Sequence, residues 1–326
     1  MTVPLRKRLK RSVRSALLRA LVRLLARVPP RAALALATAV GRAAWLVARD
    51  TRREMLAQLT SAFPEKTVAE REGIARASLV HLAWLAAEVV TLPRHRRRIA
   101  DYVALPPAAE GLLRAAVARG RGLVYVTGHV GNWELMAQRV AMLGFGSATI
   151  AKATADPGLN ALVARLRADG GLETLWREDP TTARAIIRCF KQNRMLGILI
   201  DQDTNVQGVF VPFFGRPAHT PRAAADLAMR FRAPVLVGTC RRRGPRPGDG
   251  HEVTVVEVAY DPDAPDRETE AVRLTAACTA VLEDAIRRNP PEWVWMHERW
   301  KTLPSAQASE APQAKAVPKS AELSGG

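Results

Sequence analysis

Cysteine is scarce in this chain, with only three residues among 326. Cys189, Cys240 and Cys278 are far apart, form no CxxC pair and are odd in number. These features exclude a small disulfide scaffold and provide no structural zinc site, so we expect a reducing compartment. The six histidines show no ligand spacing, and the sequence has neither a complete dinucleotide fingerprint nor a P-loop. We therefore expect no metal and no cofactor.

Long hydrophobic runs are also lacking. The longest candidate, residues 32–48, spans about 17 positions, is mostly alanine and carries Arg42 in its middle, so it is a poor membrane span. The arginines of the first 26 residues interrupt the continuous apolar centre that a secretory signal needs. The sequence thus predicts neither a spanning helix nor a signal peptide.

Acidic side chains are in deficit, with 31 against 49 basic ones, a formal net charge of +18 and a pI near 11.0. This imbalance indicates a polyanionic neighbour, such as nucleic acid, an anionic membrane surface or an acidic protein. An Ala- and Arg-rich composition also accounts for part of the charge. Because no nucleic-acid reader motif occurs, we expect no nucleic-acid partner.

The N-terminal part of the chain has helical periodicity. Residues 1–26 place apolar side chains three and four positions apart with arginines on the other side, which predicts a basic amphipathic helix. Such a helix lies in a membrane interface, or alternatively packs its leucines on a soluble core. The helical pattern continues to residue 93, with a break at Phe63-Pro64 and a capping box from Thr67 to Glu70. We assign residues 1–105 to a helical, membrane-facing segment.

From residue 106 to 303, short apolar runs alternate with helical segments. Strands are predicted near 122–127, 148–151, 172–175, 195–200, 235–239 and 253–258, with helices between most of them and a long loop after residue 200. This alternation predicts an α/β domain whose central sheet is mostly parallel and flanked by helices. Residues 304–326 are rich in Ala, Ser, Pro and Gly without periodicity and are expected to be disordered.

One candidate site follows the first of these strands. The segment TGHVGNWE begins where the predicted strand 122–127 ends, which is where α/β folds place ligands. His129 and Glu134 would lie about 140° apart on a straight helix and could not meet. Two glycines and Asn132 let the chain turn, with Asn132 capping a helix that opens at Trp133. In that geometry the Glu134 carboxylate can fold back onto the imidazole.

A His–carboxylate pair supplies two parts of a catalytic triad, since the acid fixes the tautomer and the free ring nitrogen takes a proton. The sequence has no GxSxG elbow and no cysteine near this segment. A base without a protein nucleophile fits a reaction in which the substrate attacks, such as an alcohol attacking a thioester. The alternative is ordinary structure, with His129 in a loop and Glu134 as a first-turn acid at the helix dipole.

Three ordered blocks carry a family resemblance: GHVGNWE, IDQDTNVQGVFVPFFGRPAHT and PEWVWMHERWKT. They resemble the late lipid A biosynthesis acyltransferases, which belong to the lysophospholipid and glycerol-phosphate acyltransferase superfamily with its His-x4-Asp/Glu signature. The similarity runs from about residue 24 to 303. The resemblance implies that His129 is the general base and Glu134 its partner. It also implies an acyl-carrier-protein thioester as donor and a hydroxyl of a lipid A precursor as acceptor.

The resemblance further implies substrate-binding residues outside this pair. Lys152 stands where the family tends to have a basic residue and would hold an acceptor phosphate. Asp201 and Gln202 follow the predicted strand 195–200, at the same sheet edge as His129, and match the second block. Arg216 belongs to a segment that resembles a phosphate- or acyl-facing loop, or is simply an exposed loop charge.

From these observations we expect an acyltransferase bound peripherally or monotopically at the cytoplasmic face of the bacterial inner membrane. Its expected partners are an acyl carrier protein, a lipid acceptor and the anionic membrane surface, which the positive charge would attract. Two other functions stay open: an O-acyltransferase for a lysophospholipid or another envelope lipid, and a non-enzymatic basic membrane-binding protein. The aromatic cluster of Trp293, Trp295, His297 and Trp300 is expected to pack or to lie at a membrane interface.

Overall fold

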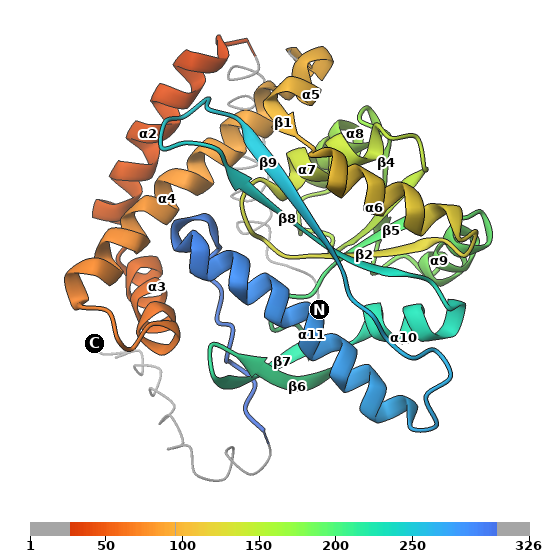
Figure 1. The fold of residues 1–326 in the computed structure, drawn as a ribbon. Coiled ribbons are helices and arrows are strands. Elements are labelled where there is room, and N and C mark those ends of the chain that lie inside the picture. The colour runs from red at the N-terminus through yellow and green to blue at the C-terminus, as the bar shows by residue number, and fades with distance from the viewer. Residues whose placement is uncertain (1–26, 95, 305–326) are drawn as a thin grey trace, which may run out of the picture.

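A seven-stranded sheet forms the centre of the computed structural model, which describes residues 27–94 and 96–304 (Figure 1). The predicted helix of residues 1–26 and nearly all of the predicted disordered tail lie outside the described residues. The strand order is β1-β9-β8-β2-β5-β3-β4. The strands are β1 (Val103–Ala104), β2 (Leu123–Thr127), β3 (Ser147–Ala151), β4 (Leu172–Trp176), β5 (Met195–Leu199), β8 (Val235–Arg242) and β9 (His251–Glu257). Only β8 and β9 pair antiparallel within this sheet, so the predicted α/β fold with a mostly parallel sheet is confirmed.

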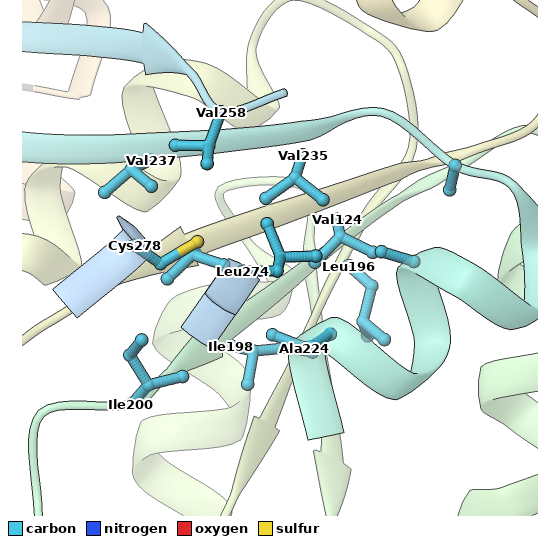
Figure 2. Packing of buried hydrophobic residues seen from close by; sticks show 14 of the residues in the cluster. Val124, Leu196, Ile198, Ile200, Ala224, Val235, Val237, Val258, Leu274 and Cys278 are labelled. Carbon is cyan, nitrogen blue, oxygen red and sulfur yellow. The ribbon is translucent and has the colours of Figure 1, made fainter. Parts of the chain in front are cut away.

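Helices cover both faces of the sheet. Because successive strand residues point to opposite sides, each strand contributes side chains to two cores. Val124 and Val126 of β2 face a core formed with α10 and α11, whereas Leu123 and Tyr125 face α6 and α7. Figure 2 shows the first of these cores. The helices of this domain are α5 (Ile99–Tyr102), α6 (Pro107–Ala118), α7 (Trp133–Ala141), α8 (Pro157–Ala168), α9 (Thr182–Lys191), α10 (Ala223–Phe231) and α11 (Arg267–Arg288).

In the described part of the chain before residue 92, the helices are α2 (Pro30–Val47), α3 (Arg49–Ala62) and α4 (Val68–Thr91). The predicted break at Phe63-Pro64 and the capping box of Thr67 and Glu70 are both confirmed. Gly41 lets α2 approach α4 closely, since a Cβ there would lie 2.6 Å from the Val80 Cα atom. Two short 3₁₀ turns, η1 (Leu92–Arg94) and η2 (Arg96–Arg98), follow α4, and a third, η3 (Pro290–Glu292), follows α11.

Within the described part of the chain, α4 is the one helix whose own length and composition would allow it to cross a membrane. Helices α2 and α3 meet that test only as a pair, and they are bent by 89°. The polar side chains Ser78, His81 and Glu88 of α4 are buried, and they bind the chain near the sheet edge. This contact positions α4 beside the candidate site.

The prediction of a long loop after residue 200 is wrong, because the structure has a hairpin there. Its strands are β6 (Gly208–Phe213) and β7 (Arg216–Pro221). Pro212 and Pro217 hide the strand signal, since proline cannot donate to a ladder. The two central turn residues, Phe214 and Gly215, have φ values of 52° and 71°, as a tight hairpin turn requires.

Candidate functional site

His129 and Asp201 meet at the carboxyl edge of the sheet. Strands β2 and β5 are parallel neighbours paired from Leu123–Met195 to Thr127–Leu199, so the residues that follow each strand lie side by side. The Asp201 Oδ1 atom accepts a hydrogen bond from His129 Nδ1 at 2.9 Å, and its Oδ2 accepts one from the His129 backbone N–H at 2.7 Å. The prediction that Asp201 shares a sheet edge with His129 is therefore confirmed.

Asp201 is a buried carboxylate that keeps its charge. Its Oδ2 atom also accepts a hydrogen bond from Trp293 Nε1 at 2.8 Å. Burial by itself raises the pKa of a carboxyl group, but His129 and the hydrogen bonds from His129 and Trp293 outweigh this and lower the pKa of Asp201 to about 2. An ionised Asp201 accepts a hydrogen bond from the Nδ1–H group, which favours the tautomer whose lone pair is on Nε2.

The imidazole of His129 is held but not enclosed. Its side chain is 23% exposed, compared with 1% for Asp201, and its ring makes an edge contact with Trp133 at 4.9 Å between centroids. Trp133 opens helix α7, whose N-cap is Asn132 as predicted, with the Asn132 side chain accepting from the Leu135 N–H. The free ring nitrogen can therefore reach a substrate group.

The contact expected between Glu134 and His129 needs correction, because the imidazole binds Asp201 instead. Glu134 lies in the first turn of α7 and pairs with Arg167 near the end of α8, with Arg167 Nε donating to its Oε2 at 2.9 Å. The Glu134 carboxylate is therefore held by Arg167 in this structure and not by the imidazole. Arg167 was missed because nothing in its local sequence marks it.

Gly128 and Gly131 allow the backbone around His129 to lie very close to neighbouring atoms. A Cβ at Gly128 would lie 2.9 Å from the Asp201 Cγ atom. Gly131 has a φ of 61°, and a Cβ there would lie 1.7 Å from the carbonyl oxygen of Cys240. Side chains at either position would displace the backbone that carries His129.

The remaining predicted site residues lie farther from the imidazole. Lys152 is exposed just after β3, on the same carboxyl edge but beyond β5, and Gln202 is partly exposed beside Asp201. Arg216 is exposed at the hairpin turn, where its guanidinium lies 5.2 Å from the ring centroid of Trp300. The structure thus brings Asp201 to His129, and substrate binding by Asp201 and by the other three residues stays a prediction.

Thiols are poorly suited to act as nucleophiles here. Cys189, Cys240 and Cys278 are all buried. Burial raises the pKa of each of them, to about 11 for Cys189 and about 12 for Cys278. Among residues 27–94 and 96–304, no group of three or more His, Cys, Asp or Glu side chains is arranged to hold a metal ion.

The similarity of this chain to known proteins agrees with the geometry. A sequence model of the bacterial lipid A biosynthesis acyltransferase family matches residues 6–302. The chain belongs to this family. Its members associate with membranes.

Among the similar proteins are a phosphatidylinositol mannoside acyltransferase from Mycobacterium tuberculosis and a lipid A biosynthesis lauroyltransferase from Escherichia coli. The first is 26% identical over 65% of this chain and 66% of its own length, and the second 27% identical over 60% and 62%. The chain thus matches slightly less than two thirds of the length of these relatives.

In this acyltransferase family member, the third sequence block supplies a residue that sequence reasoning assigned to packing. Trp293, Trp295 and Trp300 are buried in one aromatic cluster, so the packing prediction is confirmed for all three. Trp293 also donates to Asp201. The only sequence signal for this contact was that Trp293 lies in the third of the blocks that resemble the acyltransferase family.

Proposed function

We propose that this protein transfers a fatty acyl chain from an acyl-carrier-protein thioester to a hydroxyl of a lipid A precursor, with His129 as general base. The observation that carries the proposal is the His129–Asp201 pair at the strand ends, with Nδ1 bound and Nε2 free. Such a pair without a reactive thiol suits attack by the substrate itself. The acyltransferase family supports the same reaction class.

In the proposed step, His129 Nε2 removes the proton of the acceptor hydroxyl while that oxygen attacks the thioester carbonyl carbon. Asp201 holds the ring and stabilises the imidazolium that forms. When the tetrahedral intermediate collapses, the C–S bond breaks and the leaving thiolate takes the proton from His129. The products are an ester and a free thiol, and no acyl-enzyme forms.

We propose that the acyl chain enters a small slot near this pair, which must widen to take it. It lies between α7 and the sheet, has about 30 Å³ of free space and is lined by Trp133, Glu134, Met136, Arg167 and Met195, among others. Methionine side chains adapt readily, so movement of Met136 and Met195 would widen the slot for a chain. The Glu134–Arg167 ion pair would then fix one wall of the slot, which gives Glu134 a role in acyl binding as well as its predicted catalytic one.

The acceptor would approach from the exposed part of the same sheet edge. Lys152 lies two strands from β2, about 10 Å away at ordinary strand spacing, which suits contact with a phosphate of a large lipid headgroup. We also propose that Gln202 and Arg216 border this region, and that the protein works at the cytoplasmic face of the inner membrane. The basic net charge would then attract both anionic headgroups and the acidic carrier.

The test is a purified assay with acyl-carrier-protein donors of several chain lengths and a panel of acceptors, with products identified by mass spectrometry. The panel contains a lipid A precursor, a lysophospholipid and a mannosylated phosphoinositide. We expect acylation of the lipid A precursor and a loss of about 10²–10⁴-fold in turnover for His129→Ala. Absence of turnover with every acceptor would instead support the non-enzymatic membrane-binding protein.

A second His–Asp pair provides the matched control. His219 Nδ1 lies 3.2 Å from Asp203 Oδ1, so His219→Ala removes a similar pair from β7. We expect His219→Ala to retain much more turnover than His129→Ala. A larger loss for His219→Ala would move the general base to His219, and a trapped acyl-enzyme would contradict direct attack.

A further inference from the structure

A large groove lies between helices α2 and α4, the carboxyl end of β8 and the segment that follows α11. It has a volume of about 870 Å³, and neither His129 nor Asp201 is among its described lining residues. Trp45 of α2 and Trp84 of α4 contribute aromatic surface to its walls. The groove is therefore separate from the slot proposed for the acyl chain.

Basic side chains surround this aromatic surface. Arg42 of α2, Arg76 of α4 and Arg242 of β8 all line the groove. Glu292 is the one acid among its described lining residues, and its carboxylate already accepts two hydrogen bonds from the Arg242 backbone N–H, at 3.1 and 3.0 Å. Arg76 pairs with Glu72, but its side chain is 57% exposed, so this surface pair is weak.

Arg42 is the cation best placed to bind a ligand. It is exposed and forms no ion pair with any residue in the described part of the chain. Guanidinium groups bind phosphate oxygens through paired charge-assisted hydrogen bonds. A site with a free arginine at its rim and tryptophans inside suits one molecule that has an anionic head and an apolar tail.

The rim of the groove is continuous with an apolar edge of α2. Leu46 lines the groove and is 71% exposed, and Val47 beside it is 78% exposed. Leu36 and Val40 are also exposed on this helix, at 48% and 55%. An apolar tail could therefore continue from the groove onto this edge, as in a lipid drawn partly out of a bilayer.

The N-terminal residues 1–26 do not have the charge of an occupant that this groove would attract. Residues 1–26 contain many basic side chains and no Asp or Glu, so they carry the same sign as the groove. We infer that the groove is a second lipid site, which binds an anionic amphiphile with a phosphate headgroup near Arg42 and Arg76 and an apolar chain against Trp45 and Trp84.

This site lies directly behind the segment that carries His129. His81, which lines the groove, donates from Nε2 to the Gly131 carbonyl at 3.2 Å. Gly131 in turn donates its N–H to the Glu292 carbonyl at 2.8 Å. A bound lipid would thus contact both residues that hold Gly131, two positions after His129.

Gly73 provides a clean way to block the groove. It lies on α4 and lines the groove, and a Cβ there meets nothing within 4 Å. Gly73→Trp therefore fills the groove from an open position, and it also replaces a helical glycine with a better helix former. Gly111→Trp on α6 is the matched control, because Gly111 is an equally open helical glycine outside the groove.

Binding is measured by titration calorimetry on the full chain with dodecyl phosphate below its micelle concentration. We expect Gly73→Trp to weaken binding at least tenfold and Gly111→Trp to leave it unchanged. His129→Ala should also bind normally, which keeps this test independent of acyl transfer. Equal binding by Gly73→Trp and the wild type would overturn the proposal, and loss of binding in His129→Ala would move the ligand to the catalytic edge.

The headgroup is tested with Arg42→Gln, which should weaken binding about tenfold or more because a charge-assisted contact is lost. Arg184→Gln, an exposed arginine on α9, is its control. Dodecyl maltoside and inorganic phosphate should each bind much more weakly than dodecyl phosphate. Equal binding of the maltoside would show an apolar groove without anion selectivity. Equal binding of inorganic phosphate would show a simple anion site. Either result would contradict a lipid site.

Discussion

Two buried carboxylates in this molecule each bind a histidine, but they leave these histidines in different states. Asp201 binds His129 at the sheet edge, and Glu88 of α4 binds the Nε2 atom of His251 at 3.0 Å. The His129 side chain is 23% exposed, whereas His251 is fully buried. Among the described residues, neither His129 Nε2 nor His251 Nδ1 has a hydrogen-bond partner. A carboxylate–histidine pair is open to chemistry only where a ring nitrogen can reach a substrate.

The partners of Glu88 explain why it is structural. Its two oxygens also accept from Arg242, Tyr102 and Asn132, with Arg242 Nη1 at 2.7 Å, the Tyr102 hydroxyl at 2.7 Å and Asn132 Nδ2 at 2.8 Å. Burial opposes the charge of Glu88, but His251 and Arg242 lower its pKa far below the usual range. Every strong acceptor position is occupied by protein, so Glu88 has none left for a substrate.

The two carboxylates nevertheless act on one segment of chain. Asp201 binds His129, and Glu88 binds Asn132, three residues later, which caps α7. The segment that carries His129 is thus held at both ends by buried negative charge, from the residue pair after β5 on one side and from α4 on the other.

The largest expected effect is on catalysis at Asp201. The neutral amide in Asp201→Asn cannot accept hydrogen bonds from all the groups that donate to the carboxylate. The Nδ1–H tautomer of His129 therefore loses its stabilisation. We expect a fall of about 10²–10⁴-fold in kcat in the purified transfer assay, with a small change in donor KM.

Glu134→Gln is the direct comparison for this variant. It keeps the shape of the side chain but removes the charge that pairs with Arg167. We expect a smaller loss of kcat than in Asp201→Asn. The reverse order would show that Glu134 orients the base during turnover, despite its partner in this structure.

The next effect is on stability at Glu88. Glu88→Ala leaves Arg242 buried without its counter-charge and removes the bond to Asn132, so we expect the free energy of unfolding to fall by about 3–5 kcal/mol. Denaturant unfolding followed by circular dichroism measures this change. Glu270→Ala, which breaks a more exposed Arg273 pair on α11, should cost clearly less. Equal losses for the two variants would contradict a central role for Glu88.

Most strands of the sheet were predicted from sequence because they are short apolar runs, such as the one that ends at Thr127, but the two-residue strand β1 was not. Helix starts with local chemistry were also predicted, including the Asn132 cap and the Thr67 capping box. These signals depend on neighbours within a few positions, so one sequence contains them.

The partner of His129 could not be read in the same way. Glu134 was the nearest carboxylate along the chain, whereas Asp201 lies 72 positions away and meets His129 only because β2 and β5 are neighbours. Sequence reasoning placed both residues at one sheet edge but had no means of finding strand order. The Glu88 network was missed for the same reason, because its four partners come from three separate parts of the chain.

The smallest expected effect comes from His81, which is buried like His251 but has a carbonyl rather than a carboxylate as its partner. Burial, with a further contribution from Arg242, lowers the pKa of His81 to about 4, so the native state keeps it neutral. The unfolded chain binds a proton near pH 6.5, and stability is therefore lost as the pH falls from 6.5 toward 4. His81→Gln retains a donor for the Gly131 carbonyl but cannot titrate. Between pH 7 and pH 5 we expect the wild type to lose about 2 kcal/mol more unfolding free energy than His81→Gln, as measured by urea denaturation at each pH. Parallel pH profiles for the two proteins would contradict this prediction. They would mean that His81 is protonated in the native state and carries a buried charge while it donates to Gly131.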